Sequence, residues 1–513
     1  MTRADATQVA RATERLALLV TLAFVLVRLV ASGAMGLGVD EAYTASVSRD
    51  LHLSYFDHPP LHQWIAHGGE ALFGFGRWAR LPFIALFAGS SWMMFRLTRR
   101  LFGDAAGLWA VIALNLSAFF TLAAGEWILP DGPLAFCELG AALCLARQLF
   151  PRPDEPARPW LWWLATGLWL GLAALSKYQA ATVGLGLAVY LLSTPTGRRE
   201  LRGPWPYAAG LAILVVSSPV LVWNAGHHWI SFTFQGDRGA PHRLTPLGPV
   251  IDLVAQAGLL LPWIAVPLAW AGYGALRRGR SDLPAWFCLM AAAPTVVLFS
   301  VLPLFGTKVL PHWPMPGWLM LFPVLGQALA GARGSWPRPW AIASAVALLA
   351  FWGLAVSDAA TGWIRDAFPR AFLKADPTLE AAEWTRLRGD LAARGLLDPP
   401  GLFVAAVKWN EAGKIDQALG GKTPVLVFSP DPREFAFRPP SSGLIGHDAL
   451  IIGAGSAVRD QLPAIAPHFA SLTPIEGLSV GRGDKVEIPL TVVYAHDLLT
   501  PYPLPVWASE TGR

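Results

Sequence analysis

Long apolar runs recur along the first 357 residues of the chain, and they constrain its fold more than any other feature. Hydrophobic residues make up 54% of the 513 residues and charged residues only 15%, against about 25% in soluble domains. Because a helix needs about 20 apolar residues to cross a bilayer, the runs predict a mainly α, polytopic bundle of about eleven transmembrane helices. The predicted spans are residues 16–35, 80–97, 105–124, 133–150, 160–176, 178–193, 207–223, 250–273, 284–304, 316–331 and 339–357.

Clusters of arginine follow the second, fourth, sixth and eighth predicted spans. They are Arg96, Arg99 and Arg100; Arg147, Arg152 and Arg158; Arg198, Arg199 and Arg202; and Arg277, Arg278 and Arg280. Since basic loops stay on the cytoplasmic side, the N-terminus is expected inside and residues 36–79 outside. The same alternation places Lys177 and the C-terminal segment outside. We therefore expect a multi-pass protein of the bacterial inner (plasma) membrane with its site facing the periplasm.

The charge pattern excludes two classes of function. The formal charge is +5, but the basic residues stand in short tracts between apolar runs, with no stripe interleaved with aromatics as nucleic-acid binding requires. Glycine-rich nucleotide loops of the GxGxxG or Walker type do not occur in the sequence, which argues against a nucleotide-driven pump. The chain is expected to be membrane-embedded and to bind no nucleic acid.

The composition changes to that of a soluble α/β module from about Thr378 onward. Residues 402–407, 424–428, 449–452 and 488–494 have the character of short buried strands separated by Gly/Pro turns. We expect a transmembrane domain over residues 1–375, with the chemistry in its first outer loop (36–79), and a small extracytoplasmic α/β domain over residues 376–513.

The first outer loop is about 45 residues long, far more than a connection between two helices needs. It contains Asp40-Glu41-Ala42-Tyr43 and Ser54-Tyr55-Phe56-Asp57-His58-Pro59-Pro60-Leu61, and it is followed by Arg77 and Arg80. Residues 42–51 and 61–73 have helical spacing of apolar side chains and are expected to lie along the membrane interface as amphipathic helices. This arrangement would hold Asp40 and Asp57 near the membrane surface.

A further acid, Asp131, stands on an outer turn at the mouth of the fourth span, in Pro130-Asp131-Gly132-Pro133-Leu134. Asp40 and Asp131 could each simply cap a helix. Acids at membrane depth are costly and are usually functional, so two of them on the same face favour a site over capping alone.

Basic side chains share the outer face with these acids. They are Lys177, the pair His227-His228, Arg238, Lys308 and His312. Lys, Arg and His are natural partners for the phosphate of a lipid. The alternative is that they extend toward lipid headgroups without a specific ligand.

The order of these motifs resembles that of the GT-C membrane glycosyltransferases over roughly residues 36–320. The closest resemblance is to the bacterial branch related to protein O-mannosyltransferases (family 39) and to the lipid A aminoarabinose transferase (family 83). The motifs that carry it are Asp40-Glu41-Ala42-Tyr43, Tyr55-Phe56-Asp57-His58-Pro59-Pro60-Leu61, Pro130-Asp131-Gly132-Pro133-Leu134 and Ser176-Lys177-Tyr178. Each is weak alone, but four in order within such a topology are specific.

The resemblance implies roles for individual residues. Asp40 matches the first-loop acid that acts as general base or orients the acceptor, and Asp131 matches a second acid near the reaction centre; both are expected to be catalytic. Asp57 and His58 stand where aminoarabinose transferases have Glu-Lys before Pro-Pro, so His58 departs from the family pattern. The full set expected to bind substrate is Glu41, Tyr43, Asp57, His58, Arg80, Lys177, Tyr178, Arg238, Lys308 and His312.

The implied activity is transfer of a sugar, with inversion, from a polyprenyl-phosphate donor to an extracytoplasmic acceptor: lipid A or lipopolysaccharide, an envelope glycan, or a protein. A divalent metal ion held by Asp57 and His228 is a further hypothesis, and no other cofactor is expected. Two alternatives stay open. A secondary transporter or lipid flippase would place ionisable residues near the bilayer midplane, and a non-catalytic binding protein would leave the acid-rich first loop unexplained.

Overall fold

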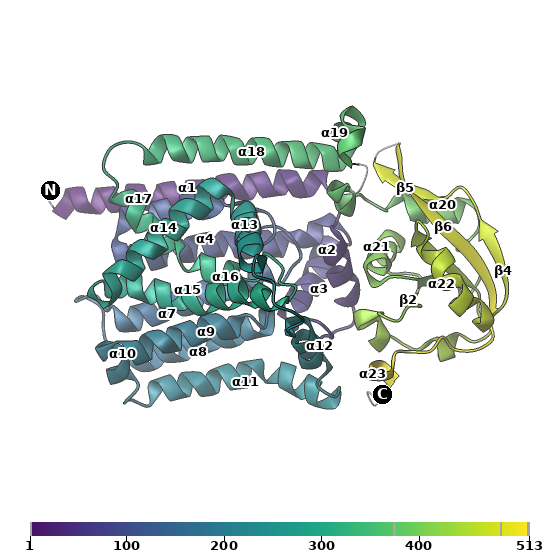
Figure 1. Ribbon diagram of the computed structural model, residues 1–513, viewed down its shortest axis with the longest axis horizontal. Helices are drawn as coiled ribbons and strands as arrows, with labels where there is room; N and C mark the ends of the chain where they lie inside the picture. Colours follow the sequence, from purple (N-terminus) through teal and green to yellow (C-terminus); the bar gives the residue numbers. More distant parts are fainter. Residues whose placement is uncertain (1–2, 373–375, 483–484, 510–513) are drawn as a thin grey trace.

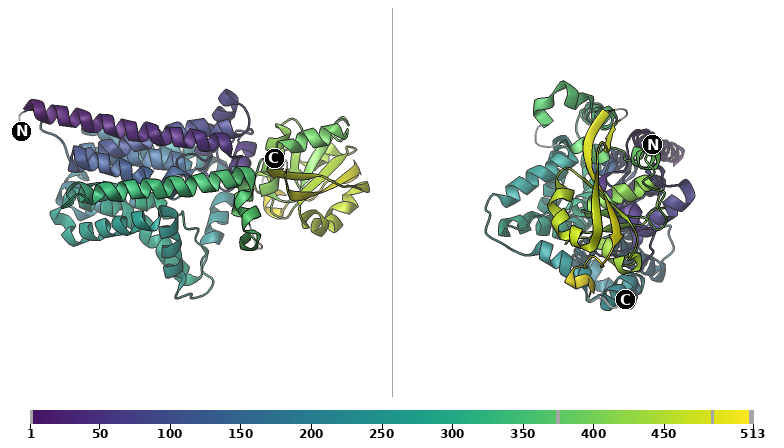
Figure 2. Two further views of the ribbon diagram at one scale, coloured as in Figure 1. Left: turned by 90° about the horizontal axis from the view of Figure 1, so that it is seen from above. Right: turned by 90° about the vertical axis from the view of Figure 1, so that its right-hand side faces the viewer.

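The computed structural model describes residues 3–372, 376–482 and 485–509. A bundle of long helices forms the N-terminal part of the molecule and an α/β unit the C-terminal part, and the two meet end to end (Figures 1 and 2). Within the described residues, the strands all lie between Phe403 and Leu498. The structure is therefore mainly helical, with strands confined to its C-terminal unit.

Helices occur in every one of the segments expected to span the membrane. The bundle contains α1 (Arg3–Ala34), α4 (Leu81–Phe102), α5 (Asp104–Asn115), α6 (Ala118–Thr121), α7 (Asp131–Leu149), α8 (Pro159–Ser176), α9 (Ala180–Ser193), α10 (Pro195–Glu200), α11 (Trp205–Gly226), α13 (Gly248–Leu260), α14 (Pro262–Arg278), α15 (Leu283–Val301), α16 (Met315–Leu319), α17 (Phe322–Ala330) and α18 (Pro337–Thr361). By length and apolar composition, 5 helices of the described residues can cross a membrane, or 6 if one bent pair counts as a span. The count of about eleven spans stays a prediction.

The prediction of one continuous helix over residues 250–273 is wrong. The chain breaks at Leu261, whose φ is 74°, and the helices on either side are bent by 112°. Pro262 explains the break, because proline lacks the N–H that would continue helix α13 and disfavours helical geometry at the residue before it.

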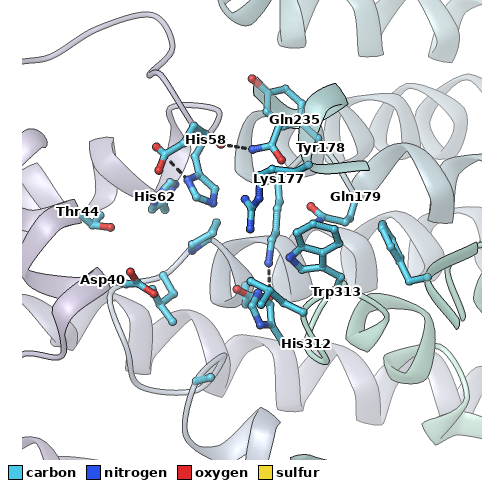
Figure 3. A pocket seen from close by; sticks show the side chains of 18 of the residues that line it. Asp40, Thr44, His58, His62, Lys177, Tyr178, Gln179, Gln235, His312 and Trp313 are labelled. Carbon is cyan, nitrogen blue, oxygen red and sulfur yellow. Dashed lines mark hydrogen bonds and ion pairs between the residues drawn. The ribbon is translucent and has the colours of Figure 1, made fainter. Parts of the chain in front are cut away.

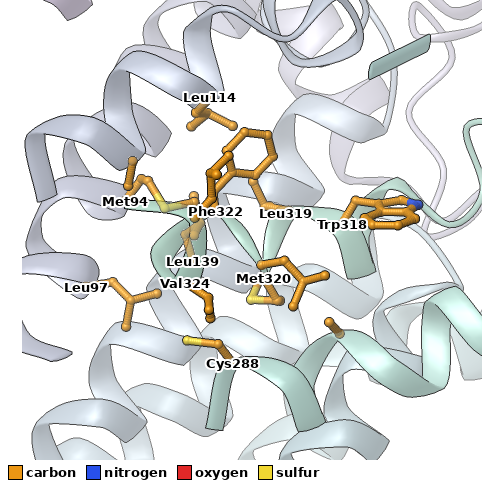
Figure 4. Close-up of a cluster of buried hydrophobic side chains, with 14 of the residues drawn as sticks. Met94, Leu97, Leu114, Leu139, Cys288, Trp318, Leu319, Met320, Phe322 and Val324 are labelled. Carbon is orange, nitrogen blue, oxygen red and sulfur yellow. The ribbon is translucent and has the colours of Figure 1, made fainter. Parts of the chain in front are cut away.

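The core of the bundle is a large cluster of apolar side chains where helices from distant parts of the sequence meet. Met94, Leu97, Leu114, Leu139 and Cys288 come together with residues 318–324 in this cluster (Figure 4). Small residues permit the close approach of the helices. A Cβ added to Gly326 would lie 2.4 Å from the carbonyl oxygen of Ala106, so α17 and α5 pack backbone against backbone.

The C-terminal unit is built on a mixed sheet with the strand order β2-β1-β3-β6-β4, and β5 pairs with β6. Its strands are β1 (Phe403–Ala406), β2 (Val425–Val427), β3 (Ala449–Ala454), β4 (Phe469–Ile475), β5 (Ser479–Arg482) and β6 (Lys485–Leu498). β1 is parallel to β2 and β3, whereas β6 is antiparallel to β3, β4 and β5. Helices α20 (Arg386–Ala393), α21 (Trp409–Leu419) and α22 (Ala457–Ile465) accompany the sheet. The four strands expected from the sequence are confirmed, and β4 and β5 were not predicted.

The first outer loop lies between the bundle and the C-terminal unit (Figure 1). Its helices are α2 (Val39–Val47) and α3 (Leu61–Phe73). Helix α2 does not present an apolar face to lipid, because the residues from Glu41 to Val47 are all buried inside the protein. Tyr43 and Val47 share a hydrophobic core with strands β1, β2 and β3, so the C-terminal unit covers α2.

Helix α2 packs directly on helix α21. A Cβ added to Gly413 would lie 2.5 Å from the backbone nitrogen of Tyr43, so the two backbones touch. Arg49 pairs with Asp416 at 2.9 Å, and the buried Lys414 ammonium donates to the carbonyl oxygens of Ala382, at 3.0 Å, and of Leu37. The C-terminal unit thus fixes the position of the helix on which Asp40 stands.

We predict that Gly413→Ala destabilises the protein, because the new methyl group collides with backbone atoms of α2 that cannot rotate away. Overpacking of this kind costs about 1–3 kcal/mol. Thermal unfolding of the purified protein measures the effect. Gly389→Ala in α20 is the matched control, since its Cβ would meet nothing within 4 Å; equal melting temperatures for the two variants would contradict the packing described.

Candidate active site

A cavity of about 590 Å³ opens where the bundle, the first outer loop and the C-terminal unit meet. Asp40, Asp57, Asp131 and Lys177 all line it. Asp40 and Lys177 lie on different walls of the cavity in Figure 3. Aromatic side chains from α6, the loop before α16 and α21 supply much of the remaining wall. The cavity has the size of a small-molecule site with a few convergent charged groups.

Asp131 and Lys177 form a buried ion pair on one side of the cavity. Asp131 is the first residue of α7 and Lys177 follows the last residue of α8, so the adjacent ends of the two helices bring the side chains together. The Lys177 ammonium donates to a carboxylate oxygen of Asp131 at 2.8 Å. Asp131 is therefore committed to holding the lysine at the cavity wall.

Asp57 is also held by neighbouring side chains. His58 Nδ1 lies 3.2 Å from one of its carboxylate oxygens, and the Arg433 guanidinium donates to the other at 3.2 Å. The Tyr43 hydroxyl donates to the carboxylate at 3.4 Å. Burial raises the pKa of Asp57, but the charges of His58 and Arg433 outweigh it and hold the pKa well below its usual range. Asp57 is thus ionised and oriented by its neighbours.

Asp40 differs from the other two acids of the cavity. Its carboxylate faces the open space (Figure 3) and has no hydrogen bond or ion pair to any described residue. The surrounding protein limits its hydration and raises the pKa of Asp40, while the nearby His58 opposes the rise. Asp40 is the carboxylate that is free to accept a proton from a bound molecule.

Two imidazoles of the cavity are uncharged near neutral pH. Burial, reinforced by the charge of Lys177, lowers the pKa of His312 to about 4. Burial and the neighbouring His58 hold the pKa of His62 well below its ordinary value. His312 lies with Lys177 at the cavity (Figure 3), where a neutral ring can exchange hydrogen bonds with a ligand.

Arg238 offers a cation without an acidic partner. It stands on helix α12 (Ile230–Gly239), lines the cavity and contacts the rings of Phe234 and Trp313, whose centroids lie 5.6 and 4.9 Å from its guanidinium carbon. Among the described residues, no carboxylate forms an ion pair with it. Its donors are available to an anion. Tyr178 lines the cavity nearby, and Gln235 donates to the backbone oxygen of Asp57 at 2.7 Å.

Glu41 and Arg80, which were expected to bind substrate, do not line the cavity. Both are buried and form an ion pair behind it, with the Arg80 nitrogens 2.6 and 2.8 Å from the two carboxylate oxygens of Glu41. Glu41 also accepts the backbone N–H groups of Gly38 and Ile128, at 2.7 and 3.0 Å. The pair joins α2 to the start of α4 and to the loop before Asp131, so it positions the acids of the cavity and does not contact a ligand there.

Lys308 and His228 also lie outside the cavity wall, and both side chains are exposed. The hypothesis of a metal held by Asp57 and His228 gains no support, because the described residues contain no group of three or more His, Cys, Asp or Glu able to hold an ion. Asp57 is engaged instead by His58 and Arg433.

Among the cavity residues that the sequence did not predict, two come from the C-terminal unit. Trp409 and Arg433 line the cavity. Trp409 follows strand β1 and Arg433 follows strand β2, and these strands are parallel neighbours. Carboxyl ends of parallel strands are the usual place for ligand contacts in α/β sheets. The strand assignments could therefore have drawn attention to both segments, although neither contains a motif.

Comparison with known proteins relates parts of the chain to GT-C-fold glycosyltransferases of families 39 and 83. The family described as dolichyl-phosphate-mannose-protein mannosyltransferase matches residues 57–223. Lipid A galacturonosyltransferase RgtD of Rhizobium johnstonii is 28% identical over 311 residues, which cover 56% of this chain and 60% of that relative.

Solved structures show the same fold over nearly the whole chain. ArnT from Cupriavidus metallidurans bound to undecaprenyl phosphate has a TM-score of 0.63 at 20% identity, covering 92% of this chain and 97% of that one. Its apo structure gives a TM-score of 0.61 at 19% identity with the same coverage. The likeness includes the C-terminal unit, since it extends over nine-tenths of the residues.

We predict that Glu41→Gln strongly destabilises the protein, because it removes the carboxylate that accepts two hydrogen bonds from the buried Arg80 guanidinium and leaves only Glu126, 3.7 Å from Arg80 Nη1, as an acidic partner. Breaking one partner of a buried ion pair costs about 3–5 kcal/mol. The measurement is the melting temperature of the purified protein. Asp366→Asn, which removes the exposed ion pair with Lys485, is the control and should cause no measurable change; a Glu41→Gln variant as stable as this control would show that the pair does not hold the loop.

Proposed function

We propose that the chain is a glycosyltransferase that moves a sugar from a polyprenyl-phosphate donor to an extracytoplasmic acceptor. The relatives support this class of reaction: one is named a lipid A galacturonosyltransferase, and the ArnT structure with the same fold holds undecaprenyl phosphate. The acceptor is lipid A or another part of lipopolysaccharide, an envelope glycan, or a protein. A cavity with unpaired and paired cations beside a free carboxylate suits a donor with a phosphate leaving group.

The proposal depends most on one observation: of the three acids at the cavity, two carboxylates have basic partners and one does not. Asp131 is paired with Lys177 and Asp57 with His58 and Arg433, while Asp40 alone is left unpaired at the cavity. A base must keep an accessible lone pair within hydrogen-bond reach of the proton it removes. Among the three acids, Asp40 meets that requirement.

In the proposed reaction, an acceptor hydroxyl gives its proton to Asp40 as its oxygen forms a bond to C1 of the sugar. The bond from C1 to the phosphate oxygen breaks on the opposite side, and the electron pair leaves with the polyprenyl phosphate. This single displacement inverts the configuration at C1. Arg238 and Lys177 stabilise the negative charge of the departing phosphate, which is often the larger contribution to catalysis.

An acceptor that is itself a phosphate would need no base. In that case Asp40 orients the acceptor, and the basic side chains of the cavity bind both the acceptor phosphate and the donor phosphate. Asp131 then serves in both cases by holding Lys177 at the wall, and His312 supplies neutral hydrogen-bonding groups beside them.

The proposal includes the arrangement in the membrane. We propose about eleven spans in residues 1–375, an extracytoplasmic domain over residues 376–513, and a cavity that opens to the periplasm of the inner membrane. The basic clusters at the ends of even-numbered spans support this orientation. A polyprenyl-phosphate carrier would deliver the sugar there, since nucleotide sugars are confined to the cytoplasm.

A secondary transporter or lipid flippase is the alternative. Two observations favour it. The bundle contains a helix broken at Leu261, and it contains a buried carboxylate, Glu138, without a hydrogen bond among the described residues. Discontinuous helices and buried charges are typical of transporters. A transporter would move its lipid without breaking the bond at C1, which a transfer assay distinguishes.

We predict that Asp40→Asn lowers the rate of sugar transfer by about 10²–10⁴-fold, the usual contribution of a positioned base. Transfer of labelled sugar from undecaprenyl-phosphate donor to envelope acceptors measures the rate, and binding of undecaprenyl phosphate tests whether the site is intact. Asp237→Asn, an exposed residue of α12 outside the cavity wall, is the control. Full activity of Asp40→Asn would remove the base mechanism; mass spectrometry of envelope lipids and glycans from a deletion strain would identify the missing sugar.

We also predict a characteristic pH dependence. The base must be ionised, so kcat/KM falls as the pH drops through the pKa of Asp40, which the surrounding protein raises above the ordinary value of about 4 by limiting hydration of the carboxylate. The acidic limb of the pH–rate profile should therefore lie above pH ~4. A profile that stays flat down to that pH would show that a proton is not transferred to Asp40.

A further inference from the structure

Arginines and aromatic rings alternate in a continuous stack along one wall of the cavity. The Arg433 guanidinium lies between Trp409 and Phe234, 4.5 and 4.8 Å from their ring centroids. The Arg238 guanidinium lies between the same Phe234, at 5.6 Å, and Trp313, at 4.9 Å. Two cations thus flank one phenylalanine ring. They belong to different parts of the molecule, since Arg433 comes from the C-terminal unit and Arg238 from α12.

The stack brings two positive charges close together without neutralising both. Arg433 pairs with Asp57 and Asp431, which engage its Nη1 and Nε atoms, whereas Arg238 has no ion pair to the described residues. Because a guanidinium has five N–H donors, both arginines retain donors that can turn to a ligand. Both arginines line the same cavity, so their remaining donors can reach one anion bound there.

The backbone of Arg433 indicates that its position is specifically built. Its φ is 52°, in the left-handed region that residues other than glycine rarely adopt. The next residue is anchored, because the Glu434 carboxylate accepts the backbone N–H of Phe56 at 2.6 Å and its own N–H donates to the Tyr43 hydroxyl at 3.2 Å. Strain of this kind persists only where the surroundings enforce it, and it is concentrated at functional sites.

We propose that Arg433 and Arg238 form a split clamp for a phosphate group, with one arginine supplied by the C-terminal unit and the other by helix α12. Guanidinium groups bind phosphate oxygens through paired, charge-assisted hydrogen bonds. The aromatic rings contact both guanidinium groups and restrict their motion. The C-terminal unit is then part of the substrate site, which is complete only when that unit is docked.

The inference rests on the proposed function, because the proposed reaction offers two phosphates that the clamp could bind. One is the phosphate of the polyprenyl donor, and the other is a phosphate on the acceptor. Both present the same chemistry to two arginines. Binding measurements with a lipid phosphate that carries no sugar, and acceptor kinetics, separate the two sources.

The test uses the full chain in lipid nanodiscs, with undecaprenyl phosphate as the probe. If the clamp takes the donor phosphate, Arg433→Gln and Arg238→Gln each weaken binding about 10- to 100-fold. The double variant loses less than the product of the two single effects, because the arginines act on one group. Arg433→Lys keeps the charge but not the fork, and it should lie between the wild type and Arg433→Gln.

Arg438→Gln is the matched control. Arg438 stacks on Phe435 at 4.6 Å and donates to the backbone oxygen of Ser46 at 2.9 Å, so it joins the same two parts of the molecule, but it does not line the cavity. Its replacement should lower the melting temperature and leave the affinity for undecaprenyl phosphate unchanged. This variant therefore measures the effect of losing a contact between the C-terminal unit and α2 without a change in the cavity wall.

Each outcome is decisive. Unchanged lipid-phosphate affinity in Arg433→Gln, together with a comparable rise in KM for the acceptor, assigns the clamp to the acceptor phosphate. Unchanged affinity and unchanged KM, with only the stability loss seen in Arg438→Gln, would overturn the clamp and leave Arg433 as a structural contact. Arginine-dependent binding by a wild-type chain that transfers no sugar would instead overturn the proposed function and leave the clamp standing.

Discussion

The buried contact between Glu41 and Arg80 is the interaction on which the rest of the site depends. One carboxylate accepts hydrogen bonds from Arg80 and from the backbone of Gly38 and Ile128, so it fixes the start of α2, the start of α4 and the loop that leads to α7. Asp40 precedes Glu41 in the chain, and Asp131 follows Ile128 by three residues. The distance between the two acids is therefore set by a charge network behind the cavity.

A second constraint comes from the C-terminal unit, which completes the first outer loop. Residues Glu41 to Val47 of helix α2 are buried, α21 packs on the helix through Gly413, and Tyr43 belongs to the hydrophobic core of the sheet. The same unit supplies Arg433 to Asp57 and Trp409 to the cavity wall. Docking of the α/β unit on the bundle thus determines both the position of the loop and the charges around the cavity.

Much of this arrangement could be predicted from local sequence patterns. Apolar runs indicated where helices lie, β-branched and apolar runs indicated four of the strands, and the positions of Asp40, Asp57, Asp131 and Lys177 near helix ends predicted their convergence. Patterns of this kind could not distinguish Glu41 from Asp40, because adjacent residues on a helix point about 100° apart and the sequence does not show which direction faces the cavity. The role of Glu41 depends on Arg80, 39 residues away.

The contribution of Arg433 and Trp409 was beyond prediction for a related reason. Their approach to Asp57 and Tyr43 joins segments more than 360 residues apart, and only the packing of the two parts of the chain brings them together. Pro262 indicates the break at Leu261 in the sequence. A prediction based on apolar content alone does not detect this break. Tertiary packing, more than composition, decides which charges face a ligand.

The most direct test of the central claim follows the fate of the bond at C1 of the donor. The purified chain would be incubated with an undecaprenyl-phosphate sugar carrying ¹³C at C1, together with an envelope extract as acceptor, and followed by ¹³C and ³¹P NMR. The account predicts release of free undecaprenyl phosphate and a new glycosidic carbon of inverted configuration. A donor that is bound but keeps its C1–phosphate bond intact would contradict it.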